Sequence, residues 1–376
     1  MTKIPTSSEE KLLQEHGYKL IKKIGEGGYA KVFLGEFRSK NTEKVYPLAC
    51  KVINTNGAPE KYTNKFLPRE MKILVKINHP HIIHIHSIFQ RNKIFFIFMR
   101  YAEKGDLLDF LLANGALKER QARIWVRQLA LALQYLHTLE IAHRDIKCEN
   151  VLVTNNYNVK LADFGFSRRV LDTDGRRLTS ETFCGSLQYA PPEIIKGTPY
   201  HPKVADMWSF GVVMFTMLNK ANPFNEKNHR TLHSLQVNKK WKFRSQVANN
   251  ISPEAKDLVS NLLEPVATKR FSIDEVINSS WIAMDPKLKS LNAAEFAAIS
   301  AAMEEAQGLQ AEKAQMVRSV SFNLRNITKD KCMNIRIPVR LLHVIDSFIS
   351  VKLHKAHLGT QNEFGLAKSE INKKDD

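Results

Sequence analysis

The chain has 376 residues, of which 43% are hydrophobic, so it can bury one large core or two ordinary ones. Its formal net charge of +18 is spread along the chain without a long basic block, which argues against nucleic acid as the main partner. The four cysteines form no C-x-x-C pair and no stretch approaches about 18 uninterrupted apolar residues, so the sequence predicts no disulfide framework, zinc ribbon or membrane span.

Short runs of β type dominate residues 18–101. Four of them, "YKLIKKI", "KVFLGEF", "VYPLACKVI" and "KIFFIFM", are separated by the turn-like "SKNTEK" and the polar "FQRN", which predicts a small antiparallel sheet. Between the third and fourth runs, "KFLPREMKILVKI" predicts one helix that packs on the sheet, with Pro68 in its first turn. Its expected apolar face consists of Leu67, Met71, Leu74 and Val75.

After about residue 102 the apolar period lengthens. "ARIWVRQLALALQYLHTL" and "VADMWSFGVVMFTML" are apolar enough to be core helices. From about Ala283 onwards, "NAAEFAAISAAMEEAQGLQAEKAQM" is expected to be helical, and an apolar segment, "IRIPVRLLHVIDSFISVKL", follows it. The polar end of the chain is expected to be disordered.

The stretch "IGEGGYAKVFLG" (residues 24–35) contains closely spaced glycines. A dinucleotide-binding loop opens a helix and a P-loop ends in Gly-Lys-Ser/Thr, but here "AKVFLGEF" follows with the pattern of a strand. Two interpretations remain. The stretch is either a plain hairpin turn or a turn in which Gly25 and Gly27 let backbone N–H groups approach phosphate oxygens while Val32 packs over a base.

Two charged residues downstream favour the phosphate interpretation. "LACKVI" places Lys51 in a strand, with the small Ala49 on the same face, which leaves room for a flat purine beside a cation. "PREMKIL" places Glu70 on the helix, where it can pair with Lys51 and hold it extended. Taken alone, each could equally be a solvated surface charge.

The segment "IAHRDIKCENVLV" crowds Asp145, Lys147 and Asn150 between two apolar runs, and "LADFGFS" adds Asp163. Phosphoryl transfer needs these residue types: a carboxylate that accepts or orients a hydroxyl proton, a cation near the phosphoryl group, and oxygen ligands for a divalent metal. A structural turn explains an Asp-x-Gly sequence, but it does not explain the whole series in this order.

These motifs, "GEGGYAKV", "LACK", "HRDIKCEN", "DFG" and "YAPPE", resemble the protein-kinase signature set over about residues 18–282. Finer details resemble the calcium/calmodulin-kinase-like branch, and "FLPRE", "TFCGS" and "ATKRFSIDEVINSSWI" look most like the testis-specific serine/threonine kinase family. The resemblance implies an α+β fold of two lobes. We expect a β-rich N-lobe with one helix (18–101), a mainly helical C-lobe (102–282), an N-terminal extension (1–17) and a partly helical C-terminal extension of unknown role (283–376).

The resemblance also implies catalytic roles. Lys51 is expected to hold the α and β phosphates of ATP and Glu70 to order that lysine. Asp145 is expected to accept the hydroxyl proton and Lys147 to neutralise the γ-phosphate. Asn150 and Asp163 would then bind Mg²⁺, with Mn²⁺ as the alternative.

The hinge between the lobes is expected to contribute the adenine contacts, with Met99 at the back of the pocket, and Asp106 would meet the ribose. The full expected nucleotide set is Gly25, Gly27, Gly28, Val32, Ala49, Lys51, Met99, Tyr101, Ala102 and Asp106. Ala30 replaces the third glycine of the usual loop and Pro191 replaces the alanine of Ala-Pro-Glu, and neither change removes a catalytic group.

Acceptor choice is also implied. Lys147 resembles the lysine of serine/threonine kinases, and Ser186 would sit where such kinases have a hydroxyl that bonds the catalytic aspartate and lysine. The expected partners are therefore proteins with Ser or Thr acceptors. Glu149 and Asp106 resemble acidic positions that favour arginine upstream of the acceptor, or they are plain solvated carboxylates.

Regulation is expected at Thr182, where related kinases have an activating phosphate added by an upstream kinase or by autophosphorylation. Its charge of about −2 can bind Arg144 and Arg168 and order the loop. Three further residues resemble structural ones: Glu193 pairs with Arg270, and Asp206 braces the catalytic loop.

Two rival functions stay open: a pseudokinase scaffold without turnover, although all four usual catalytic residues are present, and an interaction module in the C-terminal extension. In that extension "RSVS" makes Ser321 a candidate for autophosphorylation. The histidines of "HPHIIHIH" suggest zinc, but a His-Pro-x-Ile connection of a kinase explains them better. The acidic N-terminus leaves no room for a secretory signal, so we expect a cytoplasmic protein with nuclear access left open.

Overall fold

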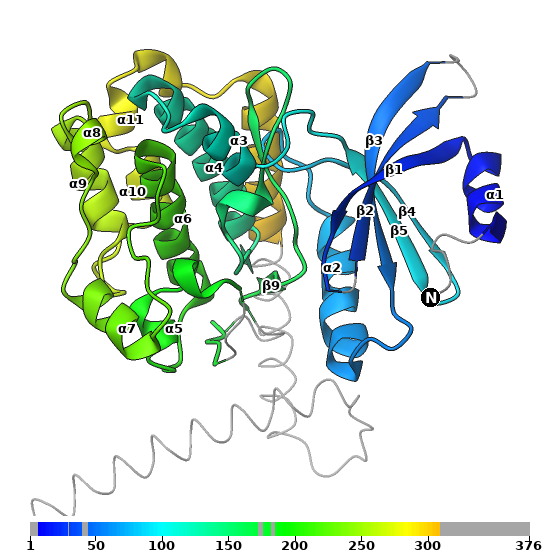
Figure 1. Cartoon of the computed structure of the whole chain (residues 1–376), viewed down its shortest axis with the longest axis horizontal. Coiled ribbons are helices and arrows are strands. Elements are labelled where there is room, and N and C mark those ends of the chain that lie inside the picture. Colours follow the sequence, from blue (N-terminus) through cyan, green and yellow to red (C-terminus); the bar gives the residue numbers. More distant parts are fainter. Residues whose placement is uncertain (1–6, 29, 40–43, 172–175, 182–184, 309–376) are drawn as a thin grey trace, which may run out of the picture. The chain divides into compact units, whose positions relative to one another are not determined.

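The first lobe is built on a five-stranded antiparallel sheet. The computed structural model describes residues 7–28, 30–39, 44–171, 176–181 and 185–308, and the sheet has the order β1-β2-β3-β5-β4 (Figure 1). Its strands are β1 (Tyr18–Glu26), β2 (Ala30–Arg38), β3 (Val45–Asn54), β4 (Ile85–Arg91) and β5 (Ile94–Arg100).

Strand β4 was not expected. The sequence predicts one connection, made of the histidine-rich stretch and the polar "FQRN", between the predicted helix and the strand "KIFFIFM". The structure continues the strand to Arg91 and makes the turn at Asn92, whose φ of 53° is left-handed. Most residues of β4 are only partly buried, so the strand lacks the strong apolar alternation that marks its neighbours.

One helix of this lobe, α2 (Leu67–Leu74), follows a short π-helix, η1 (Tyr62–Phe66), and has Pro68 in its first turn as expected. The predicted apolar face was wrong in part. Val75 lies beyond the helix end and is 72% exposed, whereas Glu70 and Ile73 are buried. A second helix, α1 (Ser7–Glu15), precedes the sheet and buries Leu13 against it.

The second lobe is mainly helical and is organised around α4 (Glu119–Thr138) and α6 (Pro202–Asn219), whose Trp125 and Trp208 are fully buried. This part of the chain also contains two short strand pairs, β6 (Ile141–Ala142) with β9 (Arg168–Arg169) and β7 (Val151–Val153) with β8 (Val159–Leu161). None of the described helices is long and apolar enough to cross a bilayer. The elements are α3 (Leu107–Asn114), α4 (Glu119–Thr138), β6 (Ile141–Ala142), η2 (Cys148–Asn150), β7 (Val151–Val153), β8 (Val159–Leu161), β9 (Arg168–Arg169), η3 (Leu187–Tyr189), α5 (Pro192–Ile195), α6 (Pro202–Asn219), α7 (His229–Val237), α8 (Ser245–Ala248), α9 (Pro253–Leu262), α10 (Ile273–Ile277), α11 (Ser280–Ala283) and η4 (Pro286–Leu288).

The Ala- and Glu-rich stretch is helical over residues 293–308, as the sequence predicts, and we call this element the C-terminal helix (orange in Figure 1). Ile299 and Ala302 on it are 5% and 2% exposed and belong to the main core. The apolar segment that follows and Ser321 lie outside the described residues. The observed α+β architecture of a β-rich lobe and a helical lobe confirms the expected fold class.

Candidate active site

A cavity of about 580 Å³ lies between the five-stranded sheet and the helical lobe. Its walls include β-strand residues of the first lobe, the chain that links the lobes, and residues around β7 and β8. Of the predicted nucleotide contacts, Gly27 and Gly28 do not line it. The others do: Gly25, Val32, Ala49, Lys51, Met99, Tyr101, Ala102 and Asp106.

Strand register explains how these side chains converge. Val32 of β2 pairs with Lys51 of β3, and Ala49 of β3 pairs with Met99 of β5. Because successive side chains of a strand alternate between faces, Ala49 and Lys51 project to the same side. The small Ala49, between the cation and Met99, leaves the space that a planar base requires.

The glycine-rich stretch is a turn between β1 and β2, as its strand pattern predicts. The backbone N–H of Gly27 donates to the carbonyl of Ala30 at 2.8 Å and closes the turn. A Cβ at Gly28 would meet no atom within 4 Å, and one at Gly25 would meet only Val32. The turn therefore has open space beside Gly28 and little beyond Val32 beside Gly25, which suits the close approach of a phosphate.

Lys51 makes two ion pairs in this cavity. Its Nζ donates to Oε1 of Glu70 and to Oδ1 of Asp163, at 2.8 Å each. Burial disfavours the ammonium, but the charges of Asp163 and Glu70 outweigh burial and raise the pKa of Lys51. Glu70 is 2% exposed and projects from α2, so the pair joins that helix to the sheet.

The carboxylate of Asp163 is half exposed, although its neighbour Phe164 is buried against the ring of His143. Desolvation raises the pKa of Asp163, and the charge and hydrogen bond of Lys51 more than offset it, so the pKa lies below its usual range. Asp163 is thus held ionised with an accessible oxygen, which is what a divalent cation needs.

Asp145 is 5% exposed and has two fixed partners on its own loop. Nζ of Lys147 lies 2.9 Å from its Oδ2, and the side-chain amide of Asn150 donates to the same oxygen at 2.9 Å and to the Asp145 carbonyl at 2.7 Å. Because the Asn150 nitrogen is used in this way, its amide oxygen is the atom that can ligate a cation. An amide oxygen together with the Asp163 carboxylate matches the hard-ligand preference of Mg²⁺, so the residues present fit that ion.

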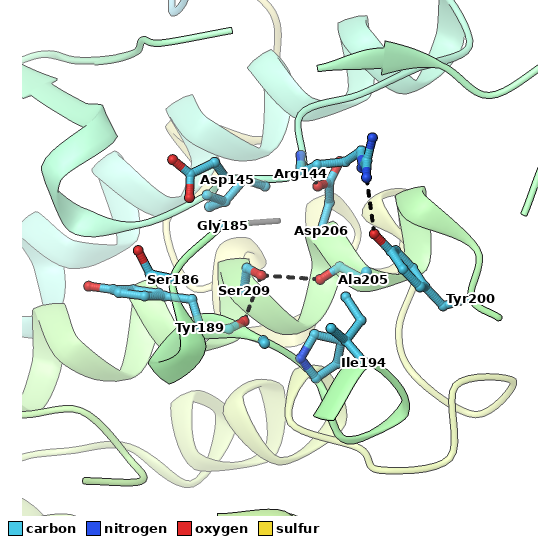
Figure 2. A pocket seen from close by; sticks show the side chains of 13 residues that line it. Arg144, Asp145, Gly185, Ser186, Tyr189, Ile194, Tyr200, Ala205, Asp206 and Ser209 are labelled. Carbon is cyan, nitrogen blue, oxygen red and sulfur yellow. Dashed lines mark hydrogen bonds between the residues drawn. The ribbon is translucent and has the colours of Figure 1, made fainter. Parts of the chain in front are cut away.

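The catalytic-loop backbone is held by Asp206 on α6, which lies next to Arg144 in Figure 2. Its carboxylate accepts the backbone N–H groups of His143 and Arg144 at 2.9 and 2.8 Å and a bond from His137 at 3.0 Å. Arg144 has a φ of 69°, a costly value for a non-glycine residue. The expected bracing role of Asp206 therefore has a physical basis, since these bonds hold a strained backbone in place.

Two other expected contacts differ in outcome. Arg270 donates to both oxygens of Glu193 at 2.7 and 2.9 Å, so this predicted pair is present. Ser186 lines the same small cavity as Asp145 (Figure 2), but in the described part of the chain no hydrogen bond joins its hydroxyl to Asp145 or Lys147. Thr182 lies outside the described residues.

Gly185 was not singled out from the sequence, yet it touches the catalytic loop (Figure 2). It has a φ of 88°, and a Cβ there would lie 3.0 Å from both Oδ1 of Asp145 and the carbonyl oxygen of Arg144. The "TFCGS" motif contains Gly185, but only the close approach of its backbone to the loop of Arg144 and Asp145 explains why glycine is required. Leu152 of β7 is another cavity wall that sequence reasoning missed, because it carries no chemical signal beyond being apolar.

We therefore expect Gly185→Ala to lower kcat about 10- to 100-fold, because the methyl group displaces Asp145 and the backbone leaves its preferred region. The KM for ATP should change little, since Gly185 does not line the nucleotide cavity. Gly197→Ala is the matched control: its φ is 77°, but a Cβ there meets nothing within 4 Å. Steady-state kinetics on both variants decide the matter, and equal losses would show that backbone strain alone is responsible.

The histidine-rich connection has other partners than a metal. His81 bonds Glu295 at 2.8 Å, and His86 contacts the hydroxyl of Tyr18 at 3.0 Å. Within the described ranges, no three His, Cys, Asp or Glu side chains cluster closely enough to hold an ion.

A comparison with protein families matches the description "Protein kinase domain" to residues 18–282. Testis-specific serine/threonine-protein kinase 1 of Mus musculus is 39% identical over 285 residues, which cover 75% of this chain and 75% of that protein. Testis-specific serine/threonine-protein kinase 3 of Mus musculus is 41% identical over 276 residues, 73% of this chain and 99% of that protein. Probable serine/threonine-protein kinase MARK-A of Dictyostelium discoideum is 35% identical over 285 residues, 73% of this chain but 26% of that protein.

These matches agree with the resemblance expected from the sequence motifs, including its testis-specific branch. They also account for a cavity that brings a partly buried lysine of the central strand β3, its paired glutamate and two candidate metal ligands together. The chain belongs to the protein kinase family and is an ATP-dependent serine/threonine kinase with Mg²⁺ as its cofactor ion.

Proposed function

We propose that this kinase transfers the γ-phosphoryl group of Mg-ATP to Ser and Thr hydroxyls of proteins with Asp145 as the group that accepts the hydroxyl proton. The observation that carries the proposal is the pair of fixed contacts on Asp145, from Lys147 at 2.9 Å and Asn150 at 2.9 Å. Both contacts are to Oδ2, and no hydrogen bond between described residues occupies Oδ1, which is the oxygen we propose for the acceptor hydroxyl. Bound Mg-ATP supplies the phosphoryl group and the divalent charge that offsets its negative oxygens.

In this mechanism the chain's own residues position the reacting groups and neutralise the negative charge of the phosphates. Lys51, held by Glu70, presents a permanent positive charge to the phosphates. Asn150 and Asp163 would ligate the metal ion, and Lys147 lies beside Asp145 where charge develops on the transferred group. We further propose residues 18–282 as the catalytic domain.

We also propose that acceptors with basic residues upstream are preferred. Asp106 caps the N-terminus of α3, where its side chain accepts the N–H of Asp109. Both residues line the cavity together with the exposed Glu149. The pKa of Asp106 is raised, chiefly by burial and further by the negative charges of Asp109 and Glu149. Hydrogen bonds from the α3 backbone act in the opposite direction but do not offset these effects. A guanidinium bound there would relieve the repulsion among these carboxylates.

Activation by a phosphate on Thr182 is the third part of the proposal. Arg144 donates to the hydroxyl of Ser180 at 3.2 Å and to that of Tyr200 at 3.4 Å. Its guanidinium therefore already faces the segment that leads to Thr182, two residues beyond Ser180. A phosphate there would gain a charge-assisted contact with the residue next to Asp145.

One kinetic experiment tests these proposals together. Labelled phosphate from Mg-ATP is offered to Ser, Thr and Tyr peptides with or without upstream arginine, using wild type, Asp106→Asn, Glu149→Gln and the distant control Glu60→Gln. We expect transfer to Ser and Thr only, and a preference for arginine that falls about 3- to 10-fold in the first two variants, as for partly exposed ion pairs. An unchanged preference would reject the acidic positions.

The same assay addresses regulation. Protein treated with a phosphatase should lose activity, and Thr182→Ala should make treated and untreated samples equal. Activity that is indifferent to both changes would remove the Thr182 proposal. Wild type that binds ATP but transfers nothing in any sample would instead favour the scaffold interpretation.

A further inference from the structure

The C-terminal helix carries a buried carboxylate that the catalytic mechanism does not use. Glu295 is 2% exposed and receives Arg127 of α4 on both oxygens, at 2.9 and 3.0 Å. Nε2 of His81 lies 2.8 Å from the same carboxylate. Burial opposes the charge of Glu295, but the bonds from His81 and Arg127 and a backbone N–H of Asn292 outweigh it, so its pKa lies far below the usual range.

Arg127 also fixes the chain that leads into this helix. Its guanidinium donates to the carbonyl of Leu288 at 2.6 Å and to that of Ser290 at 2.7 Å. The side chain of Asn292 then accepts the N–H groups of Ala294 and Glu295 at 3.0 Å each, which caps the start of the helix. The first turn is thereby anchored on the helical lobe.

The other end of the helix lies near the first lobe. Oε1 of Glu305 is 3.9 Å from Nζ of Lys76 and 3.4 Å from the guanidinium of Arg169. Between the two ends, Ile299 and Ala302 are buried in the core. The helix thus runs from α4 to the chain directly after α2.

Two polar contacts join the helix to the first lobe within the described residues, with Lys76 and His81, and both belong to the same segment. That segment connects α2, which ends at Leu74, to β4, which begins at Ile85. Because α2 also carries Glu70, any rotation or shift of this connection moves the partner of Lys51. A carboxylate with charged bonds to both α4 and this connection therefore links the helical lobe to the ion pair of the active site.

We propose that the C-terminal helix is a strut that holds α2 in the position where Glu70 pairs with Lys51, with Glu295 as its positioning residue. The part of the chain needed for full activity then extends beyond residue 282, and kcat/KM depends on a segment outside the matched kinase domain. The inference rests on the phosphotransfer function proposed above. A network of buried charges is costly for stability alone, and fixing one arrangement of neighbouring elements is a role that such networks can have.

A double-mutant cycle on the full-length chain tests the strut. Wild type, Glu295→Gln, Glu70→Gln and the double variant are compared for kcat/KM of Mg-ATP and for Tm. If Glu295 acts through Glu70, its substitution should cost about 10-fold in the wild-type background and less than about 2-fold when Glu70 is already replaced. Equal losses in both backgrounds would overturn the proposal, because they would reflect general destabilisation.

Glu304→Gln is the matched control, since it removes one charge from the exposed surface of the same helix and should leave kcat/KM within about 2-fold. If Glu295→Gln does not fold, Glu305 at the exposed end of the C-terminal helix provides the test. Glu305→Lys should lower kcat/KM about 3-fold through repulsion of Lys76 and Arg169, and adding Lys76→Glu should restore part of the loss by forming one pair again. A loss without restoration would overturn the strut. A failure of the kinase function itself would differ, because wild type would then transfer no phosphate.

Discussion

Asp145→Asn is expected to lower kcat by about 100- to 10,000-fold, the range that a positioned general base contributes. The substitution keeps size and shape, so Asn150 and Lys147 keep a polar neighbour at about the same place, but the side chain can no longer accept a proton from the substrate hydroxyl. It also removes the negative charge that faces Lys147 at 2.9 Å. Single-turnover transfer of labelled phosphate to a serine peptide measures the chemical step directly.

Binding of ATP separates this loss from a folding defect. Asp145 does not line the nucleotide cavity, so calorimetric titration should give a Kd within about 3-fold of wild type. Asp257→Asn is a suitable control, because it removes an exposed carboxylate of α9 that lines neither the nucleotide cavity nor the small cavity beside Asp145. A loss of less than about 10-fold in kcat for Asp145→Asn would show that another group accepts the proton.

Elements with a regular spacing of apolar residues could be predicted from the sequence. The first three strands follow from alternation, and α2 follows from its period and from Pro68, so the positions of Lys51 and Glu70 on adjoining elements were predictable. β4 was missed because most of its residues are only partly buried and because it directly follows a histidine-rich connection. Val75 was misplaced because the apolar pattern continues one residue past the end of the helix.

Tertiary contacts over long sequence separations had no local signal. Glu295 looks like any other glutamate of an Ala- and Glu-rich helix, yet it is buried against Arg127, which lies 168 residues earlier in the chain. Gly185 is similar, because the need for glycine arises from Asp145 and Arg144 on a separate loop. The hydrogen bond expected from Ser186 was inferred from resemblance to the family. Ser186 does lie in the same cavity as Asp145, but no hydrogen bond joins them in the described part of the chain, so the resemblance predicted the place of the residue and not its contact.

Lys51→Met is expected to lower kcat/KM for Mg-ATP by at least about 100-fold, because it removes the only cation within 4 Å of Glu70 and Asp163 among the described residues. Glu70, 2% exposed, would then be a buried charge without its partner, a defect that costs about 3–5 kcal/mol. Either α2 moves so that the carboxylate reaches water, or the carboxylate takes up a proton. The substitution itself removes the cation that faces the phosphates, and either response of Glu70 should lower Tm as well.

A second substitution distinguishes loss of stability from loss of chemistry. Lys51→Met combined with Glu70→Leu replaces the pair with apolar side chains of similar size, and such replacements of buried ion pairs are often neutral or stabilising. The double variant should therefore regain much of the lost Tm while its kcat/KM stays low. Lys19→Met, an exposed lysine of β1 in the same sheet, should change neither quantity appreciably. If activity returned together with Tm, the charge of Lys51 would be dispensable and its function would be only to support the packing of α2.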